Sequence, residues 1–253
     1  MARRAMECFR SQTYQNKRLY IYDTGLRPCT DSLPECFPGF NIVYHLGIGN
    51  GSTIGELRNR ANWWAVRPSA TSQPDADIIL HMDDDDWSHP NRIEEQVALL
   101  QASGKQAVGY RDLLFWRRTM EHEEREHYAL CSARREVCYL PGVLGEAWLY
   151  SNNDPRYCLG TSLCYWRSTW ERRPFPDISR GEDKAWLREV ESIGVPSFGE
   201  FSNIVRKRDH DGQPRMIASI HSGNHVVYEP EKHPHNWKRV PEWDQHCRET
   251  MAL

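Results

Sequence analysis

The stretch that decides the fold is 78–87, IILHMDDDDW, an apolar run followed closely by four adjacent carboxylates. Charges packed so closely repel one another unless a cation lies among them. Because side chains alternate along a strand, Asp83 and Asp85 are expected on the same side at the carboxyl edge of a sheet, where open α/β sheets bind ligands. The pattern predicts a seat for Mg²⁺ or Mn²⁺ carrying a diphosphate. Taken alone, it also fits a solvated acidic turn.

The composition outside this stretch is that of an ordinary globular protein. The chain has 253 residues, of which 39% are hydrophobic, so it is long enough for a full core. A net charge of −3 argues against a protein that coats nucleic acid in general. The sequence contains neither an apolar run of membrane-spanning length nor the apolar core of a signal peptide, which predicts a soluble, cytoplasmic protein. The eight cysteines include no Cys-x-x-Cys pair, which argues against a zinc ribbon.

The first half of the chain alternates the apolar patterns of strands and helices. Periodicity and caps predict a helix over 4–14, strands over 19–22, 41–46 and 77–82, a helix that follows the capping-box residue Thr53, and a helix from 88–90 to Gly104. Such an alternation is typical of a parallel sheet. We therefore expect an α/β fold with a mostly parallel sheet flanked by helices.

The second half is less regular. It predicts one or two strands within 106–118, a strand over 146–150, a helix from Gly181 to Gly194, and a last strand over 216–220 that leads into His221. The charged tract 121–127 is interpreted as a solvated helix rather than a metal site, because its two histidines are five residues apart. No internal repeat or linker is visible. The expected organisation is one domain over 1–225 and a C-terminal extension over 226–253.

Several motifs, in their order and spacing, resemble the family 2 glycosyltransferases of the GT-A fold, which are inverting, nucleotide-sugar-dependent enzymes. The motifs that carry the resemblance are 8–14, 19–25, 54–61, 81–93, 160–163, 174–177 and 181–183. The resemblance extends over about residues 4–225. It implies a Rossmann-like sheet and transfer of a sugar from a nucleoside diphosphate.

This resemblance implies a divalent cation, Mn²⁺ or Mg²⁺, that neutralises the departing diphosphate. Asp85 is the expected direct ligand, with Asp83 reaching either the metal or the ribose. Oxygen ligands of this hard kind suit both ions. His221 resembles the C-terminal metal-binding histidine of many such enzymes and would favour Mn²⁺, although a structural histidine at a strand end remains an equal alternative.

The resemblance also implies roles in catalysis and in donor binding. Asp183 matches the general base that takes the proton of the acceptor hydroxyl, and Glu182 would orient the acceptor or the base. The alternative is that both carboxylates only complement the dipole of the helix they begin. The donor-binding candidates are Asp23, Arg58, Asp83 and Asp84. For Arg58, an exposed arginine on a helix is the competing interpretation.

One departure from the family pattern concerns the beginning of the sequence. The family's first strand is apparently missing, because 1–6 matches the inside of the helix that follows it. We expect either an upstream strand or another segment to fill that place, since a gap would leave the sheet with an unpaired interior. The family's Gln-x-x-Arg-Trp signature of processive enzymes is absent, which indicates transfer of a single sugar.

The leading interpretation is an inverting, metal-dependent glycosyltransferase that uses a nucleotide sugar, with a UDP-sugar as the expected donor. The acceptor hydroxyl could belong to a glycan, a small metabolite, a protein or a hydroxylated nucleobase. Two alternatives stay open: a nucleotide-sugar-binding pseudoenzyme and a metal-dependent nucleotidyltransferase, which can also seat Mg²⁺ on paired aspartates. The sequence does not indicate an oligomeric state.

Overall fold

The computed structural model describes residues 2–25, 42–47, 51–67, 76–118, 145–152, 154, 157–190, 193–194, 214–220 and 229–252. The strands are β1 (Leu19–Asp23), β2 (Ile42–Leu46), β3 (Ile78–Leu80), β4 (Trp87–Ser88), β5 (Ala107–Val108), β6 (Leu113–Arg118), β7 (Gly145–Tyr150), β8 (Cys164–Trp166), β9 (Ile193–Gly194), β10 (Met216–Ile220) and β11 (Trp237–Arg239). The α-helices are α1 (Ala2–Ser11), α3 (Ile54–Val66), α4 (Arg92–Ser103), α6 (Arg167–Arg172), α7 (Glu182–Glu189) and α8 (Asp244–Met251). Three 3-10 turns are described, η2 (Gly160–Ser162) before β8, η3 (Pro230–Lys232) and η4 (Pro241–Trp243).

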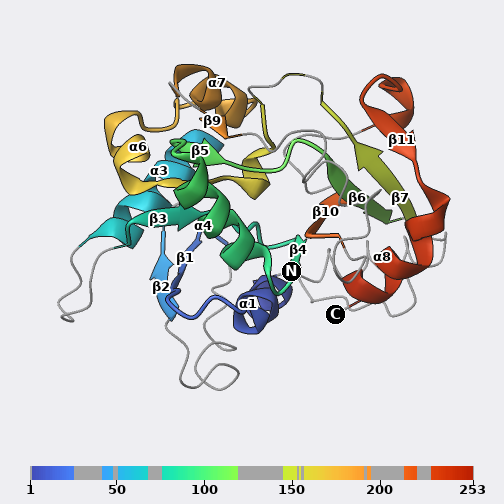
Figure 1. Ribbon diagram of the computed structural model, residues 1–253, viewed down its shortest axis with the longest axis horizontal. Coiled ribbons are helices and arrows are strands. Elements are labelled where there is room, and N and C mark those ends of the chain that lie inside the picture. Colours follow the sequence, from blue (N-terminus) through green and yellow to red (C-terminus); the bar gives the residue numbers. More distant parts are fainter. Residues whose placement is uncertain are drawn as a thin grey trace.

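The described strands form three sheets, and the fold is mixed α/β (Figure 1). Their orders are β1-β2, β3-β8-β5-β9 and β11-β7-β6-β10-β4. Among these strands three pairings are parallel and five are antiparallel, so the expected mostly parallel sheet is not found in this part of the chain. Every antiparallel pairing includes β7, β8 or β10, which come from the less regular second half. The strand-helix rhythm that predicted parallel pairing ends before them.

Two helix ends follow the local rules of capping. The side chain of Thr53 accepts a hydrogen bond from the Glu56 N–H at 3.1 Å, which caps α3. Gly104 adopts a left-handed conformation, with φ of 62°, directly after α4. Both ends lie where the sequence predicted them.

The apolar side chains of β3 point alternately to its two faces and contact helices on both of them. Ile78 and Leu80 pack with Phe9 of α1 and with α4. Ile79 belongs instead to a core built from α3, β8, α6 and α7, which includes Trp186. Because neighbouring residues of a strand face opposite ways, β3 is covered on two faces, and its carboxyl end opens between the two helix layers.

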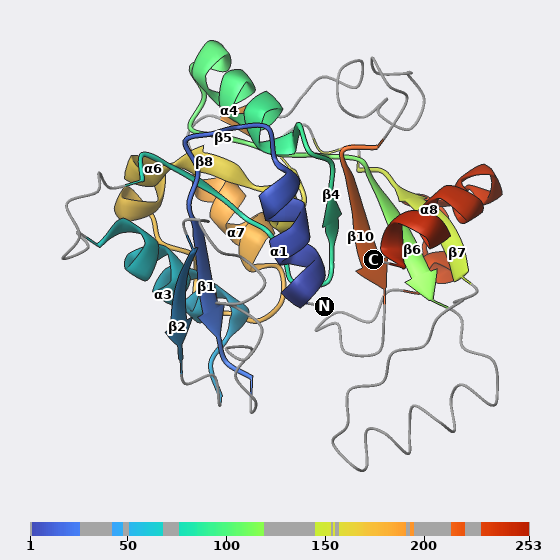
Figure 2. The ribbon, with the colours of Figure 1, turned by 90° about the horizontal axis from the view of Figure 1, so that it is seen from below.

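The described residues after 225, 229–252, contribute a strand to one of the sheets. β11 pairs with β7 in antiparallel register, with Trp237 opposite Tyr150. Cys247 and Met251 of α8 join the core below β6 and β7. Figure 2 shows α8 lying along β6 and β7. The strand predicted over 216–220 is present as β10, but β11 follows it; the division at 225 stays an expectation.

Other predictions have mixed outcomes. The helix expected from Gly181 to Gly194 ends at Glu189, and β9 occupies the end of that range. The tract 121–127 and His221 lie outside the described residues. Among the residues that the structure describes, no helix has the length and apolar character needed to cross a membrane.

Candidate functional site

The acidic run forms a loop, 83–86, between the end of β3 and the short strand β4. Its last carboxylate, Asp86, is buried and accepts hydrogen bonds from the Thr161 hydroxyl and, at 3.0 Å, from the Ser219 N–H. The main chain of Asp85 is also fixed, since its carbonyl accepts from Arg4 Nη1 at 2.9 Å and from the Ser219 hydroxyl. The side chain of Asp84 is exposed. We call 83–86 the acidic loop.

The carboxylates of the acidic loop disfavour one another's charge. Burial raises the pKa of Asp83, and the charge of Asp85 adds to that rise, while Arg58 opposes it. Burial, followed by the charges of Asp85 and Asp83, also raises the pKa of Asp86 well above its usual value. A positive ligand at this loop would therefore relieve repulsion.

Arg58, on α3, is the cation that connects the acidic loop to α7. Its Nε donates to Glu182 at 3.2 Å, and its Nη1 lies 3.9 Å from Asp83 Oδ1. Its shortest contact is to neither carboxylate: Nη1 lies 2.7 Å from His81 Nδ1. The Arg58 side chain is only 16% exposed, so it is not a solvated arginine on the helix surface, and its role in donor binding stays a prediction.

A second arginine, Arg92, donates hydrogen bonds to the main chain at the end of β3. Arg92 is fully buried and donates to the carbonyls of His81 and Thr161 at 2.8 and 3.0 Å. It also donates to the Ser88 hydroxyl at 2.8 Å and to Gln96 Oε1 at 3.0 Å. The position of the acidic loop thus depends on Arg92, which belongs to the motif 81–93 but was not predicted from the sequence as a site residue.

The start of α7 presents Glu182 and Asp183, and both lie near the loop that contains η2. Glu182 is buried beside Arg58. Asp183 Oδ2 accepts from the Gly160 N–H at 3.0 Å and from the Tyr157 hydroxyl at 3.3 Å. A Cβ added to Gly160 would lie 3.0 Å from the Asp183 side chain, a tight contact that would require Asp183 to shift by a few tenths of an ångström.

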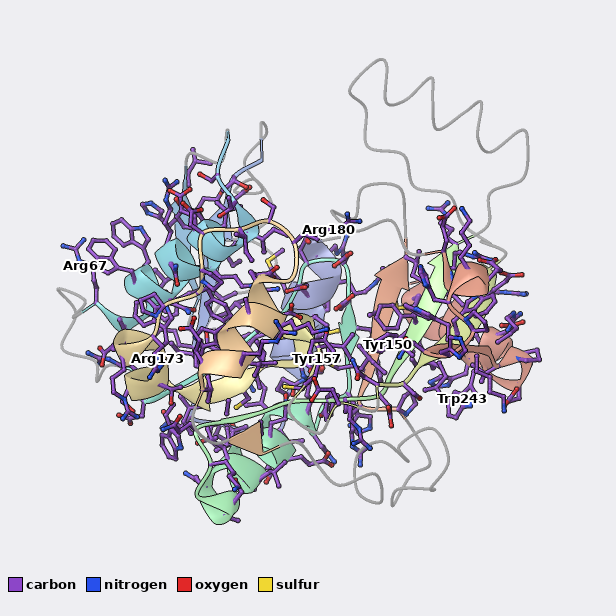
Figure 3. The ribbon with its side chains drawn as sticks, turned by 90° about the horizontal axis from the view of Figure 1, so that it is seen from above. Arg67, Tyr150, Tyr157, Arg173, Arg180 and Trp243 are labelled. Atoms are coloured by element: carbon purple, nitrogen blue, oxygen red, sulfur yellow. The ribbon has the colours of Figure 1, made fainter. Side chains whose placement is uncertain are left out.

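Tyr157 lies in the middle of the molecule (Figure 3). Its ring packs against two apolar cores, one of which contains α7 and the other β6 and β11. Its hydroxyl reaches Asp183 from there. The Asp183 carboxylate is thereby tied to both parts of the fold.

The predicted site residues are brought together only in part. Arg58, Asp83 and Glu182 form one contact group, and Asp183 adjoins it through Gly160, which contacts His81 as well. Asp23 lies at the end of β1, where it accepts from the Tyr44 hydroxyl at 2.6 Å and from the Gly25 N–H at 2.8 Å. The placement of His221 is outside the described residues, although Ser219, two positions earlier, contacts the acidic loop.

The metal prediction has chemical support but no complete ligand set in the described part of the chain. No group of three or more His, Cys, Asp or Glu side chains arranged for a metal is found among those residues. Asp83 and Asp85 supply hard oxygen atoms and repel each other, which fits Mg²⁺ or Mn²⁺ shared with a diphosphate. Asp86 fits less well, because both of its oxygens already accept hydrogen bonds.

Four positioning groups were missed as site residues from sequence: His81, Arg92, Gly160 and Thr161. The contacts that connect these residues to one another and to the acidic loop join positions 11 to 79 apart along the chain, so no local spacing identifies them. One signal was available for His81, which is a polar residue directly after the apolar run of a strand. Such a residue at the end of a buried strand needs a polar partner.

No protein-family model matches the chain, and no curated protein matches it. Solved structures of S. aureus TarS do match. TarS residues 1–349 in complex with UDP-GlcNAc aligns with a TM-score of 0.55 and 14% identity over 90% of this chain and 58% of that one. The same TarS segment with UDP aligns with a TM-score of 0.54 and 12% identity, over 87% and 56% of the two chains.

A longer TarS structure gives a TM-score of 0.53 and 15% identity over 87% of this chain and 34% of the other. The chain thus spans less than two thirds of the TarS segments that it matches. At these identities the likeness concerns the fold alone. The chain shares the fold of these TarS structures.

Proposed function

We propose that this protein is an inverting, metal-dependent glycosyltransferase that moves a single sugar from a UDP-sugar to an acceptor hydroxyl. One observation carries the proposal: Arg58 lies between Asp83 of the acidic loop and Glu182, which precedes Asp183 at the start of α7. Support also comes from the fold, because a TarS structure with the same fold binds UDP-GlcNAc. Crowded carboxylates beside a bridging arginine suit a ligand that brings both a cation and phosphates.

The donor side of the proposed reaction belongs to the acidic loop. Asp83 and Asp85 would hold Mn²⁺ or Mg²⁺ together with the diphosphate, and His221 is the proposed third protein ligand. The bound ion supplies charge neutralisation for the departing diphosphate. Arg58 offers further donors on the same side, and Asp23 is proposed to contact the ribose or nucleobase.

The acceptor side belongs to the start of α7. Asp183 Oδ1 accepts from the Lys184 N–H at 2.7 Å, while Oδ2 accepts from Gly160 and Tyr157. A carboxylate has about four acceptor positions, so these three donors leave room for an acceptor hydroxyl. Asp183 is therefore the proposed general base. Glu182, already engaged by Arg58, positions that arginine and α7.

The test is donor hydrolysis, which needs no knowledge of the acceptor. Purified protein is incubated with a panel of UDP-, GDP- and TDP-sugars in Mn²⁺, Mg²⁺ or EDTA, and the released nucleoside diphosphate is measured. We expect slow release from a UDP-sugar that stops in EDTA. Absence of both hydrolysis and calorimetric binding for every donor would contradict the proposal. Release of pyrophosphate from nucleoside triphosphates would favour the nucleotidyltransferase instead.

A further inference from the structure

The imidazole of His81 has more neighbours than one tautomer can satisfy. Nδ1 lies 2.7 Å from Arg58 Nη1 and 2.9 Å from the carbonyl oxygen of Gly160. A guanidinium always donates, so the first contact needs a lone pair on Nδ1. A carbonyl always accepts, so the second needs a proton on the same atom. Only one of these two bonds can exist at a time.

The contacts of the ring fit a single proton. The guanidinium 2.7 Å from Nδ1 can only donate, so Nδ1 has a lone pair whenever that bond exists, and the adjacent positive charge opposes a second proton on the ring. The ring is enclosed by Tyr165 and Phe175, with centroid distances of 5.4 and 5.6 Å. A neutral imidazole with the proton on either Nδ1 or Nε2 is therefore the form to consider.

The other ring nitrogen faces a partner that tolerates both tautomers. Nε2 lies 2.8 Å from the Tyr165 hydroxyl, which accepts a hydrogen bond from Asn62 Nδ2 at 2.8 Å. A hydroxyl can donate or accept, and an amide can turn over to do either. When Tyr165 accepts from Nε2, its own proton can go to the Asn62 oxygen. When Tyr165 donates to Nε2, it can accept from the Asn62 amide.

We propose that His81 is a positioning residue that holds Arg58 in one tautomer and releases it in the other. With the proton on Nε2, Nδ1 accepts from Arg58 and keeps the guanidinium turned inward. With the proton on Nδ1, His81 donates to Gly160, and Arg58 is free to turn to phosphate oxygens beside Asp83. One N–H bond breaks and one forms, with water as the proton carrier, and the net charge is unchanged.

This proposal rests on the proposed function, because phosphate is what draws Arg58 away. The contact of 2.7 Å between Arg58 Nη1 and His81 Nδ1 fits the holding tautomer. The Gly160 carbonyl is not orphaned there, since it also accepts from the Leu163 N–H at 3.3 Å. A diphosphate offers the guanidinium stronger, charge-assisted bonds. Donor binding should therefore shift the tautomer.

The first experiment needs no ligand. Nitrogen-15 NMR of the full chain distinguishes protonated from unprotonated ring nitrogens, and His81→Asn identifies the His81 signals. We expect Nε2 to carry the proton in the wild type and Nδ1 to carry it in Arg58→Met, because the arginine that needed the lone pair is gone. The same tautomer in both proteins, each shown to be folded by its melting curve, would overturn the proposal.

The second experiment adds UDP and Mg²⁺. The wild type should move its proton to Nδ1 on binding. Tyr165→Phe removes the acceptor for an Nε2 proton, so it should show the Nδ1 tautomer without ligand and bind UDP about threefold to tenfold more tightly. UDP binding with an unchanged tautomer, or weaker binding by Tyr165→Phe with an unchanged melting temperature, would contradict the proposal. If the wild type bound no nucleotide, the proposed function would fail, and the ligand-free comparison would still decide the role of His81.

Discussion

The acidic loop and the start of α7 both present carboxylates to the candidate site, but they stabilise them differently. In the loop, burial and mutual repulsion raise the pKa of Asp83 and Asp86. At α7, Asp183 has three protein donors, and Arg58 opposes the rise that burial causes in the pKa of Glu182. The difference teaches that protein donors already stabilise the carboxylates of α7, whereas the carboxylates of the loop repel one another and would be stabilised by a cation.

The largest expected effect tests the loop as a metal site. Asp85→Asn should reduce donor hydrolysis to the level seen in EDTA, because a neutral amide is a poor ligand for Mn²⁺ or Mg²⁺. Its melting temperature without metal should stay the same or rise slightly, since repulsion is removed while the Asp85 carbonyl keeps its bonds to Arg4 and Ser219. Asp84→Asn is the matched control, because Asp84 is exposed, and should be much milder. Full hydrolysis by Asp85→Asn would remove the metal role of this residue.

The next effect tests α7 as the catalytic side. Asp183→Asn should lower the rate of transfer or hydrolysis by about a hundredfold or more, the usual scale for loss of acid-base catalysis. UDP affinity measured calorimetrically should stay close to wild type, since the donor is assigned to the loop. Glu182→Gln should show the smaller kinetic defect. Equal losses of rate and affinity in Asp183→Asn would make Asp183 a binding or folding residue.

The third effect concerns Arg92, whose hydrogen bonds support the acidic loop and not α7. Arg92→Met should destabilise the protein by about 3–5 kcal/mol, because removing a buried, fully bonded guanidinium leaves several acceptors unsatisfied. Urea unfolding measures the change. Arg172→Met, at an exposed position on α6, is the control and should change stability little. A loss below about 1 kcal/mol for Arg92→Met would show that the loop does not depend on this residue.

The smallest effect is a pH dependence within the loop. The folded pKa of Asp86 lies well above its usual value, so ionising Asp86 costs stability as pH rises from the unfolded pKa towards the folded one. Asp86→Asn keeps partners for Thr161 and Ser219 and removes that cost. Its melting temperature without metal should exceed wild type by about 2–4 °C at pH 8, the shift made by about 1 kcal/mol in a domain of this size.

The same comparison at lower pH supplies the check on sign. Near pH 4 the wild-type carboxyl is protonated in the folded state, so the advantage of Asp86→Asn should shrink. Glu242→Gln, at an exposed position, should show no such trend. An advantage that grows on acidification would contradict the raised pKa.

Local signals predicted the parts of the fold that are decided locally. Thr53 caps α3 and Gly104 ends α4 because each acts on its own backbone within three or four residues. The strand over 216–220 followed from its continuous apolar character. α8 and β11 were not predicted. Only Cys247 and Met251 of α8 are buried, which is too narrow an apolar stripe to recognise.

The candidate site also consists of parts that local sequence predicted and of connections that it did not predict. The acidic loop and the start of α7 were found because their residues are contiguous. Their connections were not: Arg58 and His81 are 23 positions apart, and Thr161 is 75 positions from Asp86. These contacts depend on how β3, α3 and η2 pack, which no spacing along the chain records. The prediction of a mostly parallel sheet is not confirmed for the described strands, because the pairing of β7, β8 and β10 also depends on packing that no spacing along the chain records.

The hydrogen bond from Arg4 to the Asp85 carbonyl of the acidic loop bears on the order in which the protein folds. Arg4 also donates to the Met251 carbonyl, a contact that spans 247 residues. Contacts of such sequence separation carry a high loop-closure entropy and form late, and during synthesis this one cannot form until Met251 has left the ribosome. The charged loop therefore gains its final anchor at the end of folding. Before that point the four aspartates of the nascent chain are not held in one arrangement, so they do not form a preformed site for a divalent ion.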